Sequence, residues 1–414
     1  MSEGQTISVL DRFHSSAAAA RLPDLDPAPA KVPARLRVAL FSGNYNYVMD
    51  GPVRALNMLV AHLERRGHDV LVFAPTSKAP ALAHSGTLIS IPSVSLPGRR
   101  SEYRLGLGLH GRALRALTAF KPHLVHIAAP DITGFSALKY AEKAGIAAVA
   151  SFHTRFDTYP RYYGWRWLEK PLTSYMRNFY GRCAHVYAPS RSMADELIAE
   201  RIGRDVRLWT RGVDSALFSP AKRDLDWRRA KGFEDADIVV AFVGRVVLEK
   251  GIDIFAQAVC NASAAYPRVK ALVVGEGPER ARFAAKLPQG VFLGFLQGEE
   301  LARAYASADV FFNPSVTETF GNVTLEAMAS GLPSVCAAAS GSVSLVEDGR
   351  TGFLSPPEAG AAGYAEKLKR LAGEAGMRLR LGAAARARAE LYSWPAILDD
   401  LISNYRDAVS RPMR

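Results

Sequence analysis

The sequence predicts an α/β protein of two domains, each built around an open parallel sheet. Short apolar runs alternate with helix-length segments along most of the chain, which is the pattern of parallel strands joined by helical crossovers. The chain has 414 residues, of which 49% are hydrophobic, so it can bury two cores of ordinary size. Each half of the chain contains one such series of strands and helices, and a polar, charged stretch near residues 205–222 separates the halves.

In the first half, an apolar run over 36–41 precedes a loop over 42–51 and a helix pattern over 53–66, which Gly67 ends. Apolar residues at helical spacing predict a closing helix over 394–405. The other strands of the first half are expected at 70–73, 124–127, 147–152 and 186–188. Those of the second half are expected at 238–243, 269–274, 291–293, 310–312 and 334–336.

These patterns divide the chain into four segments. We expect a flexible tail over 1–34, a first domain over 35–205, a second domain over 206–390, and a closing helix and tail over 391–414. The first segment lacks the basic start and apolar run of a secretory signal. No stretch reaches the ~18 consecutive apolar residues that a membrane-spanning helix needs. Three scattered cysteines form no disulfide framework, which favours a reducing cytoplasm.

Charge is distributed unevenly between the two domains. Residues 35–204 carry 23 Lys or Arg and 11 Asp or Glu, whereas residues 205–414 carry 26 and 25. The first domain therefore holds an excess of +12, which points to an anionic partner. The excess lies apart from any nucleic-acid recognition motif, so we expect no nucleic acid as partner.

One loop with candidate chemistry follows the strand at 238–243, where ligands of open α/β sheets bind. It contains Gly244, Arg245 and Lys250. Glycine lets the backbone approach an anion, and two cations beside a helix start can neutralise a departing diphosphate. Taken singly, each cation could equally be a solvated surface residue.

A second such loop follows the strand at 310–312. It contains Glu318 and Glu326, with Phe320-Gly321-Asn322 between them at an expected helix start. Carboxylates accept paired hydrogen bonds from vicinal hydroxyls, as on a sugar and a ribose. Either glutamate alone could be an ordinary surface residue.

The order of these motifs resembles the large GT4 family of retaining GT-B glycosyltransferases, and the resemblance extends from residue 36 to residue 405. Within the family, the chain is most similar to enzymes that glycosylate diacylglycerol or related lipids, including sulfolipid synthases and lipid α-mannosyltransferases. The motifs are Gly244-Arg245 with Glu249-Lys250-Gly251, Glu318 with Phe320-Gly321-Asn322, Glu326 to Pro333, Arg211-Gly212-Val213-Asp214, and Tyr392-Ser393-Trp394.

The resemblance implies a GT-B fold, two Rossmann-like domains with parallel sheets facing a cleft, and assigns roles to individual residues. The family usually has two adjacent glycines where this chain has Asp50-Gly51, so the conformation of that loop is open. Asp131 could instead cap a helix. The implied catalytic residues are His153, Arg245, Lys250 and Glu318. The implied donor-binding residues are Gly51, Arg245, Lys250, Gly275, Phe295, Glu318, Phe320, Gly321, Asn322 and Glu326. The implied acceptor-binding residues are Asp131 and His153.

The resemblance also implies the reaction, which moves a hexose or hexuronic acid from a UDP- or GDP-sugar to an acceptor with retention, and the expected acceptor is a membrane lipid of the diacylglycerol or sphingolipid type. The leaving diphosphate accepts the acceptor's proton, so no separate base is required. Because cations neutralise the diphosphate, we expect neither a metal nor a cofactor.

An aromatic and basic segment at 159–182 is the candidate membrane contact. Its apolar stripe could be core or could lie on a membrane. Basic residues at 99–115 add a second cluster, which favours peripheral attachment to an anionic membrane, at the inner face of the cytoplasmic membrane. The residues assigned to this contact are Arg166, Lys170 and Arg177.

Three other functions remain open at this point. The acceptor could be a polysaccharide or oligosaccharide instead of a lipid. A nucleotide-sugar epimerase would have the same two domains and would need no acceptor. A basic protein that binds nucleic acid could reuse the fold.

Overall fold

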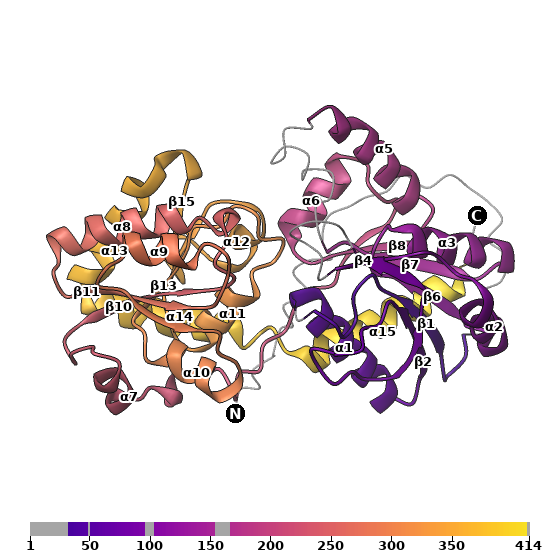
Figure 1. Cartoon of the computed structure of the whole chain (residues 1–414), viewed down its shortest axis with the longest axis horizontal. Coiled ribbons are helices and arrows are strands. Elements are labelled where there is room, and N and C mark those ends of the chain that lie inside the picture. The colour runs from indigo at the N-terminus through magenta and orange to yellow at the C-terminus, as the bar shows by residue number, and fades with distance from the viewer. Residues whose placement is uncertain (1–31, 49, 96–102, 154–165, 412–414) are drawn as a thin grey trace, which may run out of the picture.

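The computed structural model describes residues 32–48, 50–95, 103–153 and 166–411. Two α/β domains lie side by side, as Figure 1 shows, and the predicted fold class is confirmed. The first domain has a seven-stranded sheet of order β3-β2-β1-β6-β7-β8-β9, and the second has a six-stranded sheet of order β12-β11-β10-β13-β14-β15. All neighbouring strands within both sheets are parallel.

The first sheet is covered on both faces because successive side chains of a strand point to opposite sides. In β1, Val38 and Leu40 pack toward α1, whereas Ala39 and Phe41 pack toward α2, α3, α5 and α6. The strands are β1 (Arg37–Phe41), β2 (Asp69–Ala74), β3 (Thr87–Ser90), β6 (Leu124–Ile127), β7 (Ala147–Ser151), β8 (His185–Ala188) and β9 (Val206–Leu208). The helices are α1 (Gly51–Arg65), α2 (Gly111–Phe120), α3 (Ile132–Ala144), α5 (Glu169–Tyr180) and α6 (Arg191–Ala199).

The second sheet is likewise covered on both faces. Helices α8, α9 and α13 pack on one face, and α10, α11 and α14 pack on the other. The strands are β10 (Ile238–Val243), β11 (Val269–Val274), β12 (Val291–Gly294), β13 (Val310–Asn313), β14 (Ser334–Ala337) and β15 (Gly352–Ser355). The helices are α7 (Leu225–Ala230), α8 (Ile252–Ala265), α9 (Arg280–Lys286), α10 (Gly298–Ala306), α11 (Asn322–Ala329), α12 (Ser340–Leu345), α13 (Gly360–Gly373) and α14 (Ala375–Ala389).

The edges of the sheets differ from the prediction. The strands β3, β9 and β15 were not expected, nor was the antiparallel pair of β4 (Ser93–Ser95) and β5 (Arg104–Gly106). Edge strands are short and, in β3 and β9, only half-buried, so they lack the apolar run that marks a central strand. Because β9 pairs with β8, the first sheet extends beyond residue 205, where we had placed the end of the first domain.

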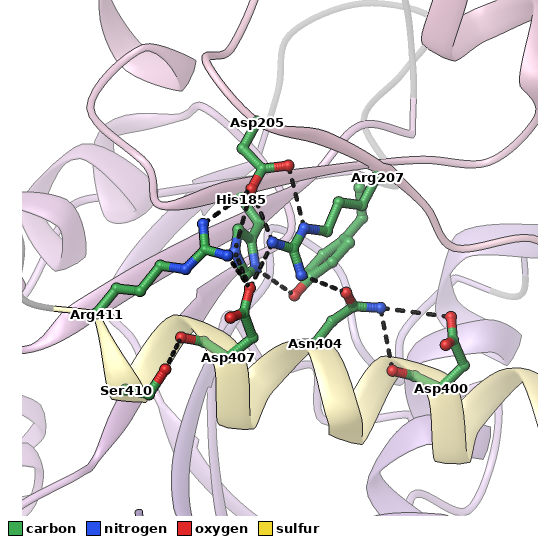
Figure 2. A network of polar contacts seen from close by, with 9 residues as sticks. His185, Asp205, Arg207, Asp400, Asn404, Asp407, Ser410 and Arg411 are labelled. Atoms are coloured by element: carbon green, nitrogen blue, oxygen red, sulfur yellow. Dashed lines mark hydrogen bonds and ion pairs between the residues drawn. The ribbon is translucent and has the colours of Figure 1, made fainter. Parts of the chain in front are cut away.

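The C-terminal helix α15 (Trp394–Ser410) returns to the first domain, where it lies beside α1 and against β6 and β7 (Figure 1). A network of ion pairs fastens its end to the edge of the first sheet (Figure 2). There Arg207 on β9 contacts Asp205 at 2.8 Å and also pairs with Asp407 of α15.

The residues just before β1 are also held in place. Arg406 of α15 donates hydrogen bonds to the carbonyls of Pro33 and Ala34 at 3.2 and 2.9 Å. The predicted flexible tail therefore does not reach residue 34, and the rest of it, residues 1–31, lies outside the described residues.

Candidate active site

Strand order reverses between β1 and β6 in the first sheet, and between β10 and β13 in the second. Parallel sheets bind ligands beyond the carboxyl ends of their strands at such reversals. The loops after β1 and β6 lead to Gly51 and Asp131, and the loops after β10 and β13 contain Arg245 and Glu318. The topology thus brings four of the predicted site residues to the two switch points.

The predicted diphosphate-binding loop lies between β10 and α8. Lys250, at the end of a short 3₁₀ turn, pairs with Glu318 at 2.5 Å between Nζ and Oε1. Arg245 is exposed. Burial raises the pKa of Asp50, at the start of α1, and the Arg245 guanidinium partly counteracts this rise. The influence of Arg245 on Asp50 connects the loop after β10 electrostatically to the first domain.

The segment from Phe320 to Asn322 forms the start of α11. Gly321 has φ of +103°, a left-handed conformation that favours glycine. The Phe320 side chain is 4% exposed and packs against Tyr392, so only its backbone could contact a ligand. The Asn322 Oδ1 atom is buried and has no hydrogen-bond partner among the described residues.

Gly51 faces this segment from the first domain. A Cβ atom at this position would lie 2.9 Å from Asn322 Nδ2, closer than real Cβ atoms come. A side chain at residue 51 would therefore displace the Asn322 side chain. Gly51 lets the two domains meet at this point with Asn322 in its present position.

Glu326 lies within α11 and has a side chain that is 13% exposed. Its carboxylate accepts a hydrogen bond from the Tyr305 hydroxyl at 3.2 Å and lies 3.7 Å from Nη1 of Arg54 on α1. Burial raises the pKa of Glu326 to about 7, although Arg54 and Tyr305 favour the ionised form. The first domain thus supplies a cation to the predicted ribose end of the donor site.

Gly275 and Phe295 lie just beyond the carboxyl ends of β11 and β12. Gly275 has φ of +135°, and a Cβ atom there would lie 1.9 Å from the carbonyl oxygen of Gly244. The loops after β10 and β11 can therefore approach only through glycine. Phe295 is 64% exposed, which leaves its ring accessible. The nucleotide-binding role of both residues stays a prediction.

His153 follows β7, and both of its ring nitrogens are hydrogen-bonded. Arg211 Nη2 lies 2.9 Å from His153 Nδ1, and because arginine can only donate, that nitrogen is unprotonated. The ring proton of a neutral His153 then lies on Nε2 and is donated to Ser151 Oγ at 2.9 Å. The Ser151 hydroxyl donates in turn to His126 Nε2 at 2.9 Å, and His126 Nδ1 bonds the Tyr405 hydroxyl of α15.

Burial, with a further contribution from Arg211, lowers the pKa of His153 well below its usual range. His153 is therefore a neutral ring whose nitrogens are occupied within the protein. Its backbone carbonyl accepts a hydrogen bond from Thr319 Oγ1 at 3.3 Å, which joins it to the loop of Glu318. The predicted contact of His153 with the sugar and the acceptor stays a prediction.

Asp131 caps α3, the alternative that the sequence left open. Its Oδ1 accepts a hydrogen bond from the Gly134 backbone at 2.7 Å. Burial raises the pKa of this carboxyl. Its other oxygen faces Gly43 in the loop after β1, where a Cβ atom would lie 3.0 Å away. Asp131 therefore caps the start of α3, and its role in binding the acceptor stays a prediction.

The described part of the chain contains no group of three or more His, Cys, Asp or Glu side chains arranged to hold a metal ion. It also contains no helix with the length and apolar character required to cross a membrane.

Both domains match known protein families. The Glycosyltransferase Family 4 domain matches residues 49–217, and the Glycosyl transferases group 1 domain matches residues 237–374. A GDP-mannose-dependent alpha-mannosyltransferase of Mycolicibacterium smegmatis is 34% identical over 382 residues, which cover 91% of this chain and 98% of the relative. The chain belongs to glycosyltransferase family 4.

Further relatives agree with this assignment. The sulfoquinovosyl transferase SQD2 of Arabidopsis thaliana is 33% identical over 90% of this chain and 74% of its own length. The alpha-monoglucosyldiacylglycerol synthase of Acholeplasma laidlawii is 26% identical over 77% of this chain and 84% of its own length. The fold is similar to that of a sucrose-phosphate synthase from Thermosynechococcus elongatus, with a TM-score of 0.74, 22% identity, and 90% and 99% coverage. The chain is a GT-B glycosyltransferase that transfers a sugar from a nucleotide sugar.

Three residues around the candidate site of this family 4 glycosyltransferase had no role in the sequence prediction. Arg54 was overlooked, although a cation one turn after a loop glycine is a usable signal. Tyr305 gave no signal, because a buried tyrosine in α10 resembles ordinary core. Arg211 was noted within a motif but received no role. It is 5% exposed, and no carboxylate among the described residues pairs with it.

The predicted membrane segment is partly core and partly exposed. Phe179, at the end of the expected apolar stripe, is buried in the first domain. Trp167 is 74% exposed, and Lys170 and Arg177 are also exposed. The Arg166 side chain lies outside the described residues, as do residues 96–102 and 154–165 of the two basic clusters.

Proposed function

We propose that this enzyme transfers a hexose or hexuronic acid, with retention, from a UDP- or GDP-sugar to a membrane lipid of the diacylglycerol or sphingolipid type. The observation that carries the proposal is the group of polar residues at the carboxyl edge of the second sheet, directly opposite Gly51 and Arg54 of the first domain. The cations suit the diphosphate of a nucleotide sugar, the helix start and one carboxylate suit its sugar, and the other carboxylate suits its ribose.

The donor lies along this edge with its diphosphate at Arg245 and Lys250. The diphosphate competes with Glu318 for Lys250, which pairs with this carboxylate at 2.5 Å. Glu318 is then available to accept hydrogen bonds from the sugar hydroxyls. The carboxylate of Glu326 receives the ribose hydroxyls, and the backbone from Phe320 to Asn322 holds the sugar.

The transfer breaks the bond between the anomeric carbon and the diphosphate and forms a bond from that carbon to the acceptor hydroxyl on the same face. The acceptor proton passes to the leaving diphosphate. Arg245 and Lys250 stabilise the charge on this leaving group, and electrostatic stabilisation of this kind is usually the largest single contribution to catalysis. The neutral ring of His153 lines the sugar end of the site and takes no proton, because Arg211 and Ser151 occupy its nitrogens.

A lipid acceptor is supported by the relative named for diacylglycerol glucosylation and by the excess of basic residues in the first domain. Each Lys or Arg near an anionic surface contributes about 1 kcal/mol of attraction. The exposed Trp167 and Lys170 at the start of α5 suit such a surface. The enzyme therefore works peripherally, at the inner face of the cytoplasmic membrane.

The test is a matrix of donors and acceptors. UDP-glucose, UDP-glucuronate and GDP-mannose are each incubated with detergent-dispersed diacylglycerol, with ceramide and with maltooligosaccharides, and products are identified by mass spectrometry and NMR. We expect an α-linked glycolipid from one donor, and none from the Glu318→Gln variant. Glycosylation of oligosaccharides alone, a β-linked product, or epimerisation of the donor without acceptor would reject the proposal.

A further inference from the structure

A pocket of about 310 Å³ lies on the first domain, where α5 and α6 end and β8 and β9 begin. It is therefore at the amino-terminal edge of the first sheet, opposite the carboxyl edge that carries the candidate active site. The size is within the ~300–1,000 Å³ range of small-molecule sites. It is lined by Arg177, Asn178, Gly181, Arg182, Arg201, Gly203 and Arg204.

Two of the four arginines are held in position by neighbours. Arg182 forms a two-pronged ion pair with Glu142 of α3. Arg177 donates from Nε to the carbonyl oxygen of Glu200 at 2.7 Å. This bond fixes the Arg177 guanidinium, while its two terminal nitrogens have no partner among the described residues.

The other two arginines are not neutralised. The side chains of Arg201 and Arg204 make no hydrogen bond or ion pair with any described residue. Asp205, which directly follows Arg204 in sequence, is directed elsewhere, toward Arg207 at 2.8 Å and Arg411 at 3.7 Å, as Figure 2 shows. Among the described residues, no carboxylate lines the pocket, and Glu142 neutralises only Arg182, so the pocket has an excess of positive charge.

Arg201 occupies a position that favours glycine. Its φ is +55°, and the backbone N–H groups of Arg201 and Ile202 bond to the carbonyls of Ile198 and Leu197 at the end of α6. This is the left-handed turn that commonly ends a helix, where glycine or asparagine is preferred. An arginine in this conformation raises the free energy of the local backbone, and a function of its side chain would explain why it is present.

We propose that this pocket binds the phosphate group of an anionic membrane lipid. Guanidinium groups bind phosphate oxygens through paired hydrogen bonds, and several arginines around one pocket are the usual arrangement for phosphate. Ile198, one helical turn before Arg201, is 58% exposed and would enter the acyl region beside the bound headgroup. The inference deepens the proposed function, on which its membrane context rests, by adding a lipid site distinct from the acceptor site.

The experiment measures sedimentation of the full-length protein with phosphatidylcholine vesicles, with and without phosphatidylglycerol. The test variant combines Arg201→Asn, which tolerates the left-handed backbone, with Arg204→Gln. The matched control combines Arg65→Gln with Lys78→Gln, which removes the same charge from exposed positions of the same domain that lie outside both basic clusters. Thermal unfolding with and without inorganic phosphate shows whether free phosphate is a ligand.

We expect the test variant to lose roughly 30-fold in partition to phosphatidylglycerol vesicles, which is the effect of two charges at about 1 kcal/mol each, and the control to lose much less. Equal losses in both variants, or no loss in either, would overturn the pocket assignment. Stabilisation of the wild type by inorganic phosphate without preference for phosphatidylglycerol would overturn the lipid assignment. The test variant should transfer sugar to detergent-dispersed lipid as well as the wild type does. If the proposed function is wrong, the wild type itself will not transfer sugar to this lipid, so the two failures can be distinguished.

Discussion

Glu326 offers the sharpest test of the donor site, because its burial has a calculable effect on stability. Its pKa rises from 4.5 to about 7 in the folded protein. That shift corresponds to a destabilisation of about 3 kcal/mol once the carboxyl is ionised, at about 1.4 kcal/mol per pKa unit. We predict that Glu326→Gln makes the ligand-free protein more stable at pH 8 by an amount approaching this value.

The sign follows from the raised pKa. Between pH 4.5 and about 7 the folded protein keeps the proton that the unfolded chain has lost, so the free energy of unfolding falls as pH rises through this window. Glutamine resembles the protonated carboxyl and can still accept a hydrogen bond from Tyr305. The advantage of the variant should therefore be near zero below pH 4.5, grow up to about pH 7, and stay constant above it.

The assay is thermal unfolding of wild type and variant across this pH range, together with nucleotide binding by calorimetry at pH 8. Each kcal/mol shifts the melting temperature of a 150–250-residue domain by about 2–4 °C, so the gain should be several degrees. The same variant should lose roughly 10-fold or more in UDP or GDP affinity, because a charged acceptor for the ribose has been replaced by a neutral one.

Glu366→Gln is the matched control, since this glutamate is exposed on the second domain and forms only a surface ion pair with Lys369. It should leave nucleotide affinity unchanged and give no gain that grows with pH. The reasoning about Glu326 is refuted if its variant is no more stable than wild type at pH 8, or if the gain is the same at pH 4 and pH 8.

Three further predictions concern the chemistry of the site. Arg245→Ala and Lys250→Ala should each lower turnover roughly 100-fold or more with an unchanged circular dichroism spectrum, and near-normal turnover in both would contradict their assigned role. Transfer should survive EDTA, whereas a complete loss that magnesium or manganese restores would show that a metal neutralises the diphosphate. Arg211→Met should raise the pKa of His153 and free its Nδ1, which nitrogen NMR of the imidazoles can follow. A wild-type His153 that is already protonated at pH 6 would contradict the tautomer assignment.

The central strands and the loops that follow them could be predicted because their signals are local. Strands buried on both faces of a parallel sheet must be apolar along their length, so β6, β10 and β11 stand at the residues that their apolar runs predict. Parallel topology then places the loops after those strands along one edge. This is why Arg245 and Glu318 could be assigned to one site before their positions were known.

Edge strands and helix ends were predicted less well, for a physical reason. An edge strand such as β9 is half-buried and pairs on one side only, so its sequence needs no long apolar run. The first sheet consequently continues to Leu208, past residue 205, the predicted end of the first domain. The sequence also predicted α15 as a helix, but it did not predict which domain the helix packs against. An apolar stripe indicates that one face of a helix is buried, and it does not identify the surface that covers this face.

The sequence by itself determined two parallel α/β domains, the family, and the polar residues at the carboxyl edge of the second sheet. Only the tertiary structure decided which of them meet. Arg54 reaches Glu326 because α1 faces α11 across the domain boundary, and this contact depends on the relative placement of whole domains. The tautomer of His153 likewise depends on Arg211, which approaches from the segment between the domains. Local sequence specifies periodicity and loop chemistry, whereas contacts between distant segments follow from packing that no local pattern encodes.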